Sequence, residues 1–184
     1  MSSMSREQLC EQSPKNIELR ALTRPLSHVR QPILDGYCAA AALKMVLMYY
    51  RVGVQSVSQL YFAVRAVAQE AGIEPGTEGL SPRQIVAYTR SLGLEATHAP
   101  DGTIDFLEQT TSAKNDTPVI VIINVNDSGR HSVVVERVTS DRVYFHDPDT
   151  FLSWPRSMTH KKFLECWNAT HNMHIVIKRP QKRK

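Results

Sequence analysis

Hydrophobic residues occupy nearly every position from Ala39 to Tyr50, and Lys44 is the single charged residue among them. A helix that is apolar on almost all sides is buried at the centre of a fold. The sequence Arg51-Val-Gly53 then ends the run. The pattern therefore predicts a central buried helix over residues 39–50.

Two further helices are predicted after it, each beginning at a serine that is typical of a helix N-cap. The first begins at Ser56, and the second begins at Ser81, where Pro82 suits the first helical position. Helical spacing predicts their inner faces, which are Leu60, Val64, Val67 and Ala68 in the first helix and Ile85, Tyr88 and Leu92 in the second.

The second half of the chain changes to strand patterns. A β-branched run over residues 118–125 is typical of a strand that is buried on both faces, and residues 142–146 alternate between apolar and polar. The elements predicted in this half are strands over 94–98, 118–125, 132–138, 142–146 and 174–178 and short helices over 103–109 and 161–167. Helices followed by an antiparallel sheet indicate the α+β class.

The net charge of +4 is a property of the C-terminal tail. Five positive charges come from Lys178, Arg179, Lys182, Arg183 and Lys184, so the rest of the chain carries +4 − 5 = −1. No surface that alternates basic and aromatic residues is evident in the sequence. Nucleic acid is therefore not an expected partner.

Three cysteines, Cys10, Cys38 and Cys166, are too few and too scattered for a disulfide framework. A reducing compartment is therefore expected. The N-terminus lacks the apolar core of a secretory signal, and no apolar run is long enough to span a bilayer. We expect a protein that works in the cytoplasm or is delivered into a target cell without a removable signal, with no membrane partner.

Cys38 stands where the central helix begins, shortly after the Asp35-Gly36 turn signal. Unpaired N–H groups and a partial positive charge at a helix N-terminus favour a thiolate over a thiol. A buried structural cysteine is the alternative. A nucleophilic cysteine additionally needs a base and a group that orients the base.

The predicted sheet supplies both groups. His131 begins one strand and Asp147 ends the next, and the turn at 139–141 joins the two as a hairpin. Because the start of one strand in a hairpin lies beside the end of the other, His131 and Asp147 are expected to meet at one edge. The side-chain amide of Gln31 and the backbone N–H of Cys38 could stabilise the oxyanion of a tetrahedral intermediate.

These segments carry a family resemblance. The sequence resembles the bacteriocin-processing, double-glycine leader peptidases of the papain-like clan. The segments that carry the resemblance are Gln31 followed by Cys38 at the start of an apolar helix, Gly79-Leu80-Ser81, His131-Ser-Val-Val-Val and Asp147-Pro. The resemblance implies a papain-like fold without a cofactor or metal, in which Cys38 is the nucleophile, His131 the general base and acid, Asp147 the orienting residue and Gln31 the oxyanion donor. It also implies cleavage after small residues, commonly Gly-Gly, in a protein or peptide substrate.

The chain departs from the family pattern at two points. Gln31 stands seven positions before Cys38 where the family usually places the glutamine six positions before the cysteine, and a bulge at Asp35-Gly36 would absorb the extra residue. Ala39 stands where a glycine usually follows the cysteine. The chain also lacks the membrane helices and ATPase of most members, and so resembles stand-alone papain-like domains that some bacteria deliver into rivals as antibacterial toxins. That use would imply a cognate immunity or inhibitor protein.

Residues 1–30 are expected to form an N-terminal arm, residues 31–178 the papain-like domain and residues 179–184 a basic tail.

Two other function classes stay open: an acyltransferase of the transglutaminase-like kind with the same triad, and a catalytically silent domain that binds leader peptides. His146 could replace His131 as the base, but strand alternation turns the side chain of His146 away from that of Asp147. His171, His174 and Cys166 could bind a metal, but no second cysteine pair exists to complete such a site.

Overall fold

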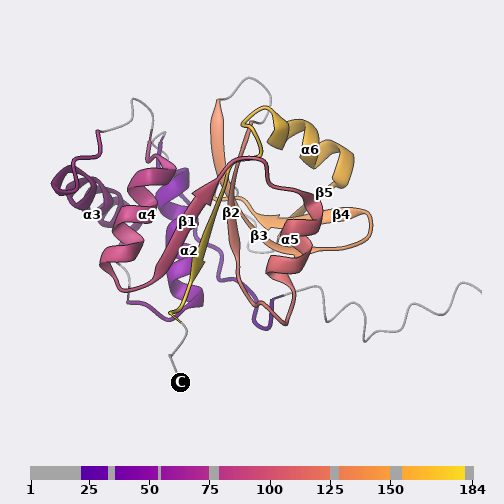
Figure 1. Ribbon diagram of the computed structural model, residues 1–184, viewed down its shortest axis with the longest axis horizontal. Helices are drawn as coiled ribbons and strands as arrows, with labels where there is room; N and C mark the ends of the chain where they lie inside the picture. Colours follow the sequence, from indigo (N-terminus) through magenta and orange to yellow (C-terminus); the bar gives the residue numbers. More distant parts are fainter. Residues whose placement is uncertain are drawn as a thin grey trace, which may run out of the picture.

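The computed structural model describes residues 22–32, 36–53, 55–74, 79–124, 129–149 and 155–180. A six-stranded sheet in the order β1-β6-β2-β3-β4-β5 runs through the middle of the molecule, and all five strand pairs are antiparallel (Figure 1). The strands are β1 (Glu95–Ala99), β2 (Val119–Asn124), β3 (Arg130–Val138), β4 (Arg142–His146), β5 (Arg156–Thr159) and β6 (His174–Lys178).

Helices cover both faces of this sheet. Those described are α2 (Cys38–Tyr49), α3 (Val57–Glu70), α4 (Pro82–Ser91), α5 (Ile104–Thr111) and α6 (His160–Asn168). Helices α2, α3 and α4 lie on one side, and α5 and α6 lie on the other (Figure 1). The predicted α+β class is confirmed.

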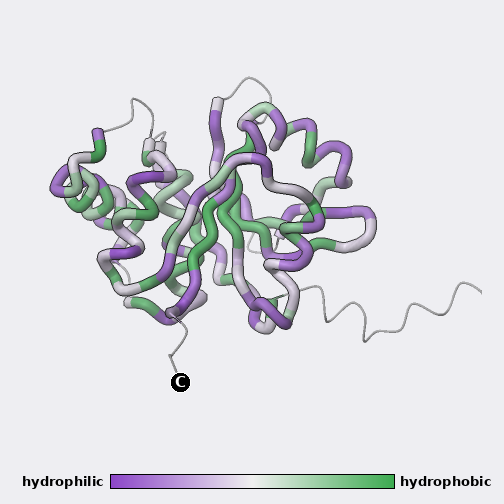
Figure 2. The backbone as a smooth tube through the Cα atoms, in the orientation of Figure 1, coloured by the Kyte–Doolittle hydropathy of each residue, from purple (hydrophilic) through white to green (hydrophobic). Residues whose placement is uncertain are grey.

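Strand alternation divides the hydrophobic core into two layers. On β2, Ile120 and Ile122 pack with α2, whereas Val119, Val121 and Ile123 pack with α5 and α6. A strand that is buried on both faces reads as a continuous apolar run, as predicted for residues 118–125. Figure 2 shows this hydrophobic stretch in the middle of the fold, with hydrophilic positions on the outer helices.

The predicted central helix is observed as α2. From Ala39 to Leu47 every residue except Lys44 is buried, so α2 packs against other elements on almost every side. The two serine N-caps are also observed, because Ser56 and Ser81 each form a capping box with the glutamine three residues later.

The inner face of α4 differs from the prediction. Ile85 is buried, but Leu92 is 40% exposed and Tyr88 is only half-buried, whereas Val86 and Gln84 are buried. Leu92 lies beyond the end of α4 as its C-cap, so helical spacing no longer determines its direction. Strand β5 was not predicted. Residues 125–128, which include the last residue of the strand predicted over 118–125, and residues 151–154 lie outside the described residues.

Residues 22–32 carry the chain to the site without regular secondary structure. Leu22 and Leu26 are buried in the core beside α2. The backbone N–H of Leu22 donates to the carbonyl of Glu136 (3.4 Å), and that of Gln31 donates to the carbonyl of Pro148 (2.9 Å). This segment therefore places Gln31 next to the loop that follows β4.

Candidate active site

Cys38 is the first residue of α2, and its surroundings favour negative charge. The N-cap residue, Tyr37, makes no side-chain capping bond, and the first turn contains no acidic residue. Among the described residues, neither a capping side chain nor an acidic residue of the first turn therefore neutralises the positive end of the helix beside the Cys38 sulfur. The residue is partly exposed, as a nucleophile that must meet a substrate has to be.

His131 and Asp147 come together across the β3–β4 hairpin. The last paired residues of this hairpin are Val134 and His146, so His131 lies on β3 just beyond the end of β4, and Asp147 follows β4 directly. His131 Nε2 lies 2.7 Å from Asp147 Oδ1. The side chains of His131 and Asp147 are only 19% and 9% exposed, so this pair is largely shielded from water.

The Asp147 carboxylate accepts two further hydrogen bonds. Its Oδ1 also accepts from the backbone N–H of Asp149 (3.0 Å), and its Oδ2 accepts from Arg156 Nη1 (2.8 Å). Burial alone would raise the pKa of Asp147, but the His131 contact, the Asp149 N–H and the Arg156 charge lower it to about 2. Asp147 is therefore ionised at neutral pH and held in one orientation.

The other ring nitrogen of His131, Nδ1, is left for Cys38, with which His131 shares a hydrogen bond. Burial would lower the pKa of His131, but the contacts with Asp147 and Cys38 raise it to about 10. Burial would likewise raise the pKa of the Cys38 thiol, but His131 and hydrogen bonds from Ser132 lower it below its usual value. These opposite shifts favour a thiolate–imidazolium pair at neutral pH.

Sequence reasoning missed Arg156 and Ser132. Arg156 begins β5, a four-residue strand that lacks a clear alternating pattern, so its position opposite Phe145 on β4 could not be foreseen. Ser132 follows His131, and strand alternation sends successive side chains to opposite faces. Adjacency therefore gave no reason to expect both His131 and Ser132 at the Cys38 sulfur.

Gln31 lies at the same corner, but its amide faces the Asp147 loop. Its Nε2 donates to Asp149 Oδ1 over 3.3 Å, while its Oε1 is buried and has no hydrogen-bond partner. A bulge was expected at Asp35-Gly36. Asp35 lies outside the described residues, and Gly36 has a backbone φ of +86°.

The loop before α4 contacts the loop before Cys38. A β-carbon on Gly79 would lie 2.9 Å from the Gly36 carbonyl oxygen, and Gly79 has a φ of +63°. Both observations require glycine at position 79. The segment Gly79-Leu80-Ser81, which was singled out in the sequence, thus supports the turn that leads into Cys38.

His146 belongs to a separate pair. Its Nε2 lies 2.9 Å from Glu136 Oε2, and its side chain is 2% exposed. Glu136 is the extra residue of a β-bulge between Val135 and Arg137. The side chains of His146 and Asp147 thus have different partners, as strand alternation predicted.

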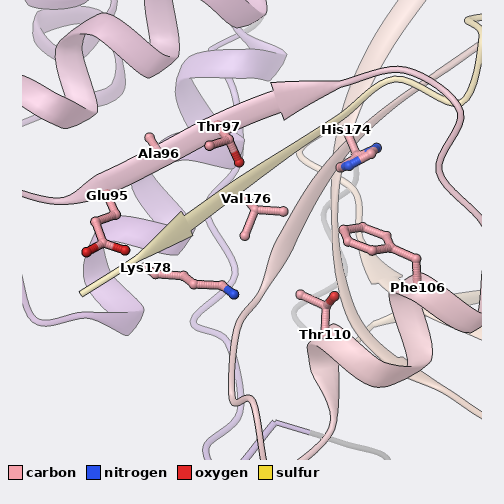
Figure 3. A pocket seen from close by; sticks show the side chains of 8 residues that line it. All are labelled: Glu95, Ala96, Thr97, Phe106, Thr110, His174, Val176 and Lys178. Carbon is pink, nitrogen blue, oxygen red and sulfur yellow. The ribbon is translucent and has the colours of Figure 1, made fainter. Parts of the chain in front are cut away.

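A hollow of about 310 Å³ lies elsewhere, between α5 and the strands β1 and β6. Figure 3 shows Phe106 and Thr110 of α5 on one side of it and His174 and Val176 of β6 on the other. Because Cys38, His131 and Asp147 do not line it, this hollow is not the site of the thiol chemistry.

The described residues contain no cluster of three His, Cys, Asp or Glu side chains placed to hold a metal. His171, His174 and Cys166 were considered as an alternative metal site, and of these His174 places its Nδ1 3.2 Å from the Asn172 carbonyl oxygen. In the same described ranges, every helix falls short of the length and apolar character that crossing a membrane requires.

The arrangement of Cys38, His131 and Asp147 suits nucleophilic catalysis. A thiolate can attack an electrophilic carbon, an imidazolium can return a proton to a leaving group, and a fixed carboxylate can hold the imidazole in one orientation. Acyl-group chemistry at a carbonyl carbon is what these three groups together support.

Comparisons with solved structures find the same fold. The peptidase domain of Streptococcus ComA, a bi-functional ABC transporter involved in a quorum-sensing pathway, aligns with a TM-score of 0.64 at 19% identity over 85% of this chain and 100% of that one. A putative C39-like peptidase from Bacillus anthracis aligns with a TM-score of 0.66 at 17% identity over 88% and 98% of the two chains.

A double glycine motif protease from an AMS/PCAT transporter, solved in complex with the leader peptide, aligns with a TM-score of 0.59 at 22% identity over 87% of this chain and 98% of that one. A comparison with curated proteins finds no significant match. The model of the peptidase C39 family matches residues 35–182, which is most of the sequence. The chain therefore belongs to the peptidase C39 family and is a papain-like cysteine peptidase.

Proposed function

We propose that this peptidase cleaves after small residues, at Gly-Gly sites in a peptide or protein substrate, with Cys38 as nucleophile, His131 as general base and acid, and Asp147 as the residue that orients His131. The observation that carries the proposal is the chain of contacts from the Cys38 sulfur through His131 to Asp147 Oδ1 at 2.7 Å. The leader peptide bound to the double glycine motif protease supports a peptide substrate of this kind.

The reaction follows from the charges of the site. The Cys38 thiolate attacks the carbonyl carbon, the carbonyl π electrons move to oxygen, and collapse of this intermediate breaks the C–N bond while His131 gives its proton to the leaving amine. A thioester remains on Cys38. His131 then takes a proton from water, the resulting hydroxide attacks the thioester, and the carboxylic acid leaves as the thiolate is restored.

Gln31 and the backbone N–H of Cys38 are the proposed donors to the oxyanion. The Gln31 amide is held next to Asp149, and its buried Oε1 has no partner. Rotation of the amide by half a turn would exchange Nε2 and Oε1 and place an N–H donor at that buried position. Loss of one such donor costs about 3–4 kcal/mol of transition-state stabilisation.

The test is a comparison of new protein N-termini in bacterial lysate treated with the wild-type protein, with Cys38→Ala or with Gln31→Ala. We expect cuts after Gly-Gly that Cys38→Ala abolishes and that Gln31→Ala slows about 10²- to 10³-fold. New N-termini that persist in Cys38→Ala would contradict the proposal, as would cuts without preference for small residues.

The identity of the cleaved proteins and two further measurements, of amine incorporation and of peptide binding, separate the remaining function classes. Export leaders among the cleaved proteins indicate processing, and essential proteins of a foreign bacterium indicate a toxin. Incorporation of an added primary amine at the cut carbonyl, in place of hydrolysis, indicates acyl transfer. Binding of Gly-Gly leader peptides without turnover indicates a silent domain.

A further inference from the structure

We propose that the side-chain hydroxyl of Ser132 is a third hydrogen-bond donor to the Cys38 sulfur and holds the nucleophile as a thiolate. The inference rests on the proposed function, in which Cys38 attacks the substrate, and it assigns a role to a residue that the triad does not include.

The position of Ser132 in the sheet supports this role. Ser132 pairs with Ile122 on β2, and both Ile122 and Val134, two residues further along β3, pack in the core layer that contains α2. Strand alternation therefore directs the Ser132 side chain towards α2, and this side chain is buried, with the residue 6% exposed.

The end of β4 leaves one edge of β3 open at this point. Pairing between β3 and β4 ends at Val134 and His146, so β4 does not cover its side of β3 beside His131 and Ser132. The pKa of Cys38 is lowered by His131 and by hydrogen bonding from the backbone N–H and the hydroxyl of Ser132, so all three groups lie within reach of the Cys38 sulfur. Three donors thus converge on one sulfur.

The hydroxyl differs from the other two donors in what it can supply. Every residue except proline would provide the backbone N–H at position 132, and His131 supplies the positive charge. Only the side chain is specific to serine, and a hydroxyl bonded to an anion forms a stronger hydrogen bond than one bonded to a neutral thiol. Ser132 therefore favours the thiolate without carrying charge and without exchanging a proton with the substrate.

The experiment measures the rate at which iodoacetamide alkylates Cys38 between pH 3 and pH 9, followed by mass spectrometry of the Cys38 peptide so that Cys10 and Cys166 do not contribute. Wild-type protein, Ser132→Ala, Ser132→Thr and Ser132→Val are compared. Thr keeps the hydroxyl, and Val has nearly the shape of Thr without it, so Thr and Val form a matched pair.

We expect Ser132→Ala and Ser132→Val to move the midpoint of the alkylation profile up by about one pH unit, since a hydrogen bond to a charged group is worth about that much. The plateau rate at high pH should rise about threefold, because a thiolate of higher pKa is more nucleophilic. Ser132→Thr should keep the wild-type profile. A loss of packing would not raise the midpoint and the plateau together while sparing Thr.

Two kinds of failure are distinguishable. An acid-shifted wild-type profile that is unchanged in Ser132→Ala, or equal profiles for Thr and Val, would overturn the role of the hydroxyl and leave the proposed function standing. An ordinary thiol profile in the wild-type protein would overturn both the thiolate–imidazolium pair and the role of Ser132. Circular dichroism of each variant establishes that the profiles describe folded protein.

Discussion

Two histidine–carboxylate pairs lie side by side on the β3–β4 hairpin, and their parts are arranged in opposite order. In the first, His131 comes from β3 and Asp147 follows β4, with 2.7 Å between nitrogen and oxygen. In the second, His146 comes from β4 and Glu136 from β3, with 2.9 Å between them. Distance and residue type therefore do not separate a reactive pair from a structural one.

The difference lies in the second ring nitrogen of each histidine. His131 uses it to contact Cys38 at the start of α2, and the His131 side chain is 19% exposed. His146 Nδ1 is buried without a hydrogen-bond partner, and the His146 side chain is 2% exposed. A histidine–carboxylate pair can take part in catalysis only where the second ring nitrogen of the histidine contacts a nucleophile that a substrate can reach.

The largest expected contrast is between His131→Gln and His146→Gln. Glutamine can still donate to the carboxylate in both places but cannot act as a base. We expect kcat/KM for a Gly-Gly peptide to fall about 10⁴-fold or more in His131→Gln. His146→Gln should keep kcat/KM within about threefold and lose about 1–3 kcal/mol of stability, because it disturbs a buried hydrogen bond.

Fluorogenic peptide hydrolysis measures the first quantity, and urea unfolding followed by circular dichroism measures the second. Equal losses of kcat/KM in two folded variants would show that the distinction between the pairs is wrong.

The second contrast exchanges the acids, as Asp147→Asn and Glu136→Gln. A neutral asparagine amide in place of the Asp147 carboxylate could not fix the same orientation of His131, so we expect kcat/KM to fall about 10²- to 10⁴-fold. Glu136→Gln should leave kcat/KM nearly unchanged, because Glu136 contacts the histidine that lies away from Cys38.

Acid unfolding checks the same carboxylate without substrate. The pKa of Asp147 is lowered from 3.8 to about 2 in the folded state, so its ionisation stabilises the fold above about pH 4, and this contribution is lost as the pH falls through 2. Asp147→Asn should remove that part of the pH dependence, which circular dichroism of the unfolding midpoint between pH 6 and pH 2 would measure. An unchanged dependence would contradict the lowered pKa.

Local sequence patterns were sufficient to predict the elements that hold Cys38, His131 and Asp147. The apolar run after Cys38 specified α2, and the turn at 139–141 specified which strand ends meet, so His131 and Asp147 could be placed together from the sequence alone. Both inferences use neighbours in the chain or a single hairpin, and such contacts are encoded by periodicity and turn residues.

Contacts between distant segments could not be predicted in this way. Arg156 reaches Asp147 only because β5 pairs with β4, and its four residues carry no distinctive pattern. The Gln31 amide meets Asp149, which is far along the chain, and no local rule describes that contact. The proposed contact between Ser132 and the Cys38 sulfur needs the side of β3 that β4 leaves open beyond Val134, which is a fact of sheet pairing rather than of residue type.

The smallest contrast concerns the two arginines of the β4–β5 pair. Arg156 Nη1 donates to Asp147 Oδ2 (2.8 Å), whereas Arg142 Nε donates to Ser157 Oγ (3.0 Å) on the neighbouring strand. Arg156→Gln should lower kcat/KM only about fivefold, because a half-exposed ion pair contributes about 1 kcal/mol, and Arg156→Lys should recover part of the loss.

Arg142→Gln is the matched control, since it removes an arginine from the same hairpin without touching the Asp147 carboxylate. The difference between wild-type protein and Arg156→Gln should shrink as KCl is raised from about 0.05 M to about 1 M, because salt screens an exposed charge more than a shielded one. The Arg142→Gln variant should show no such convergence. If both variants lose the same activity and respond alike to salt, Arg156 acts by joining the strands, and the orientation of Asp147 then depends on His131 and the Asp149 N–H alone.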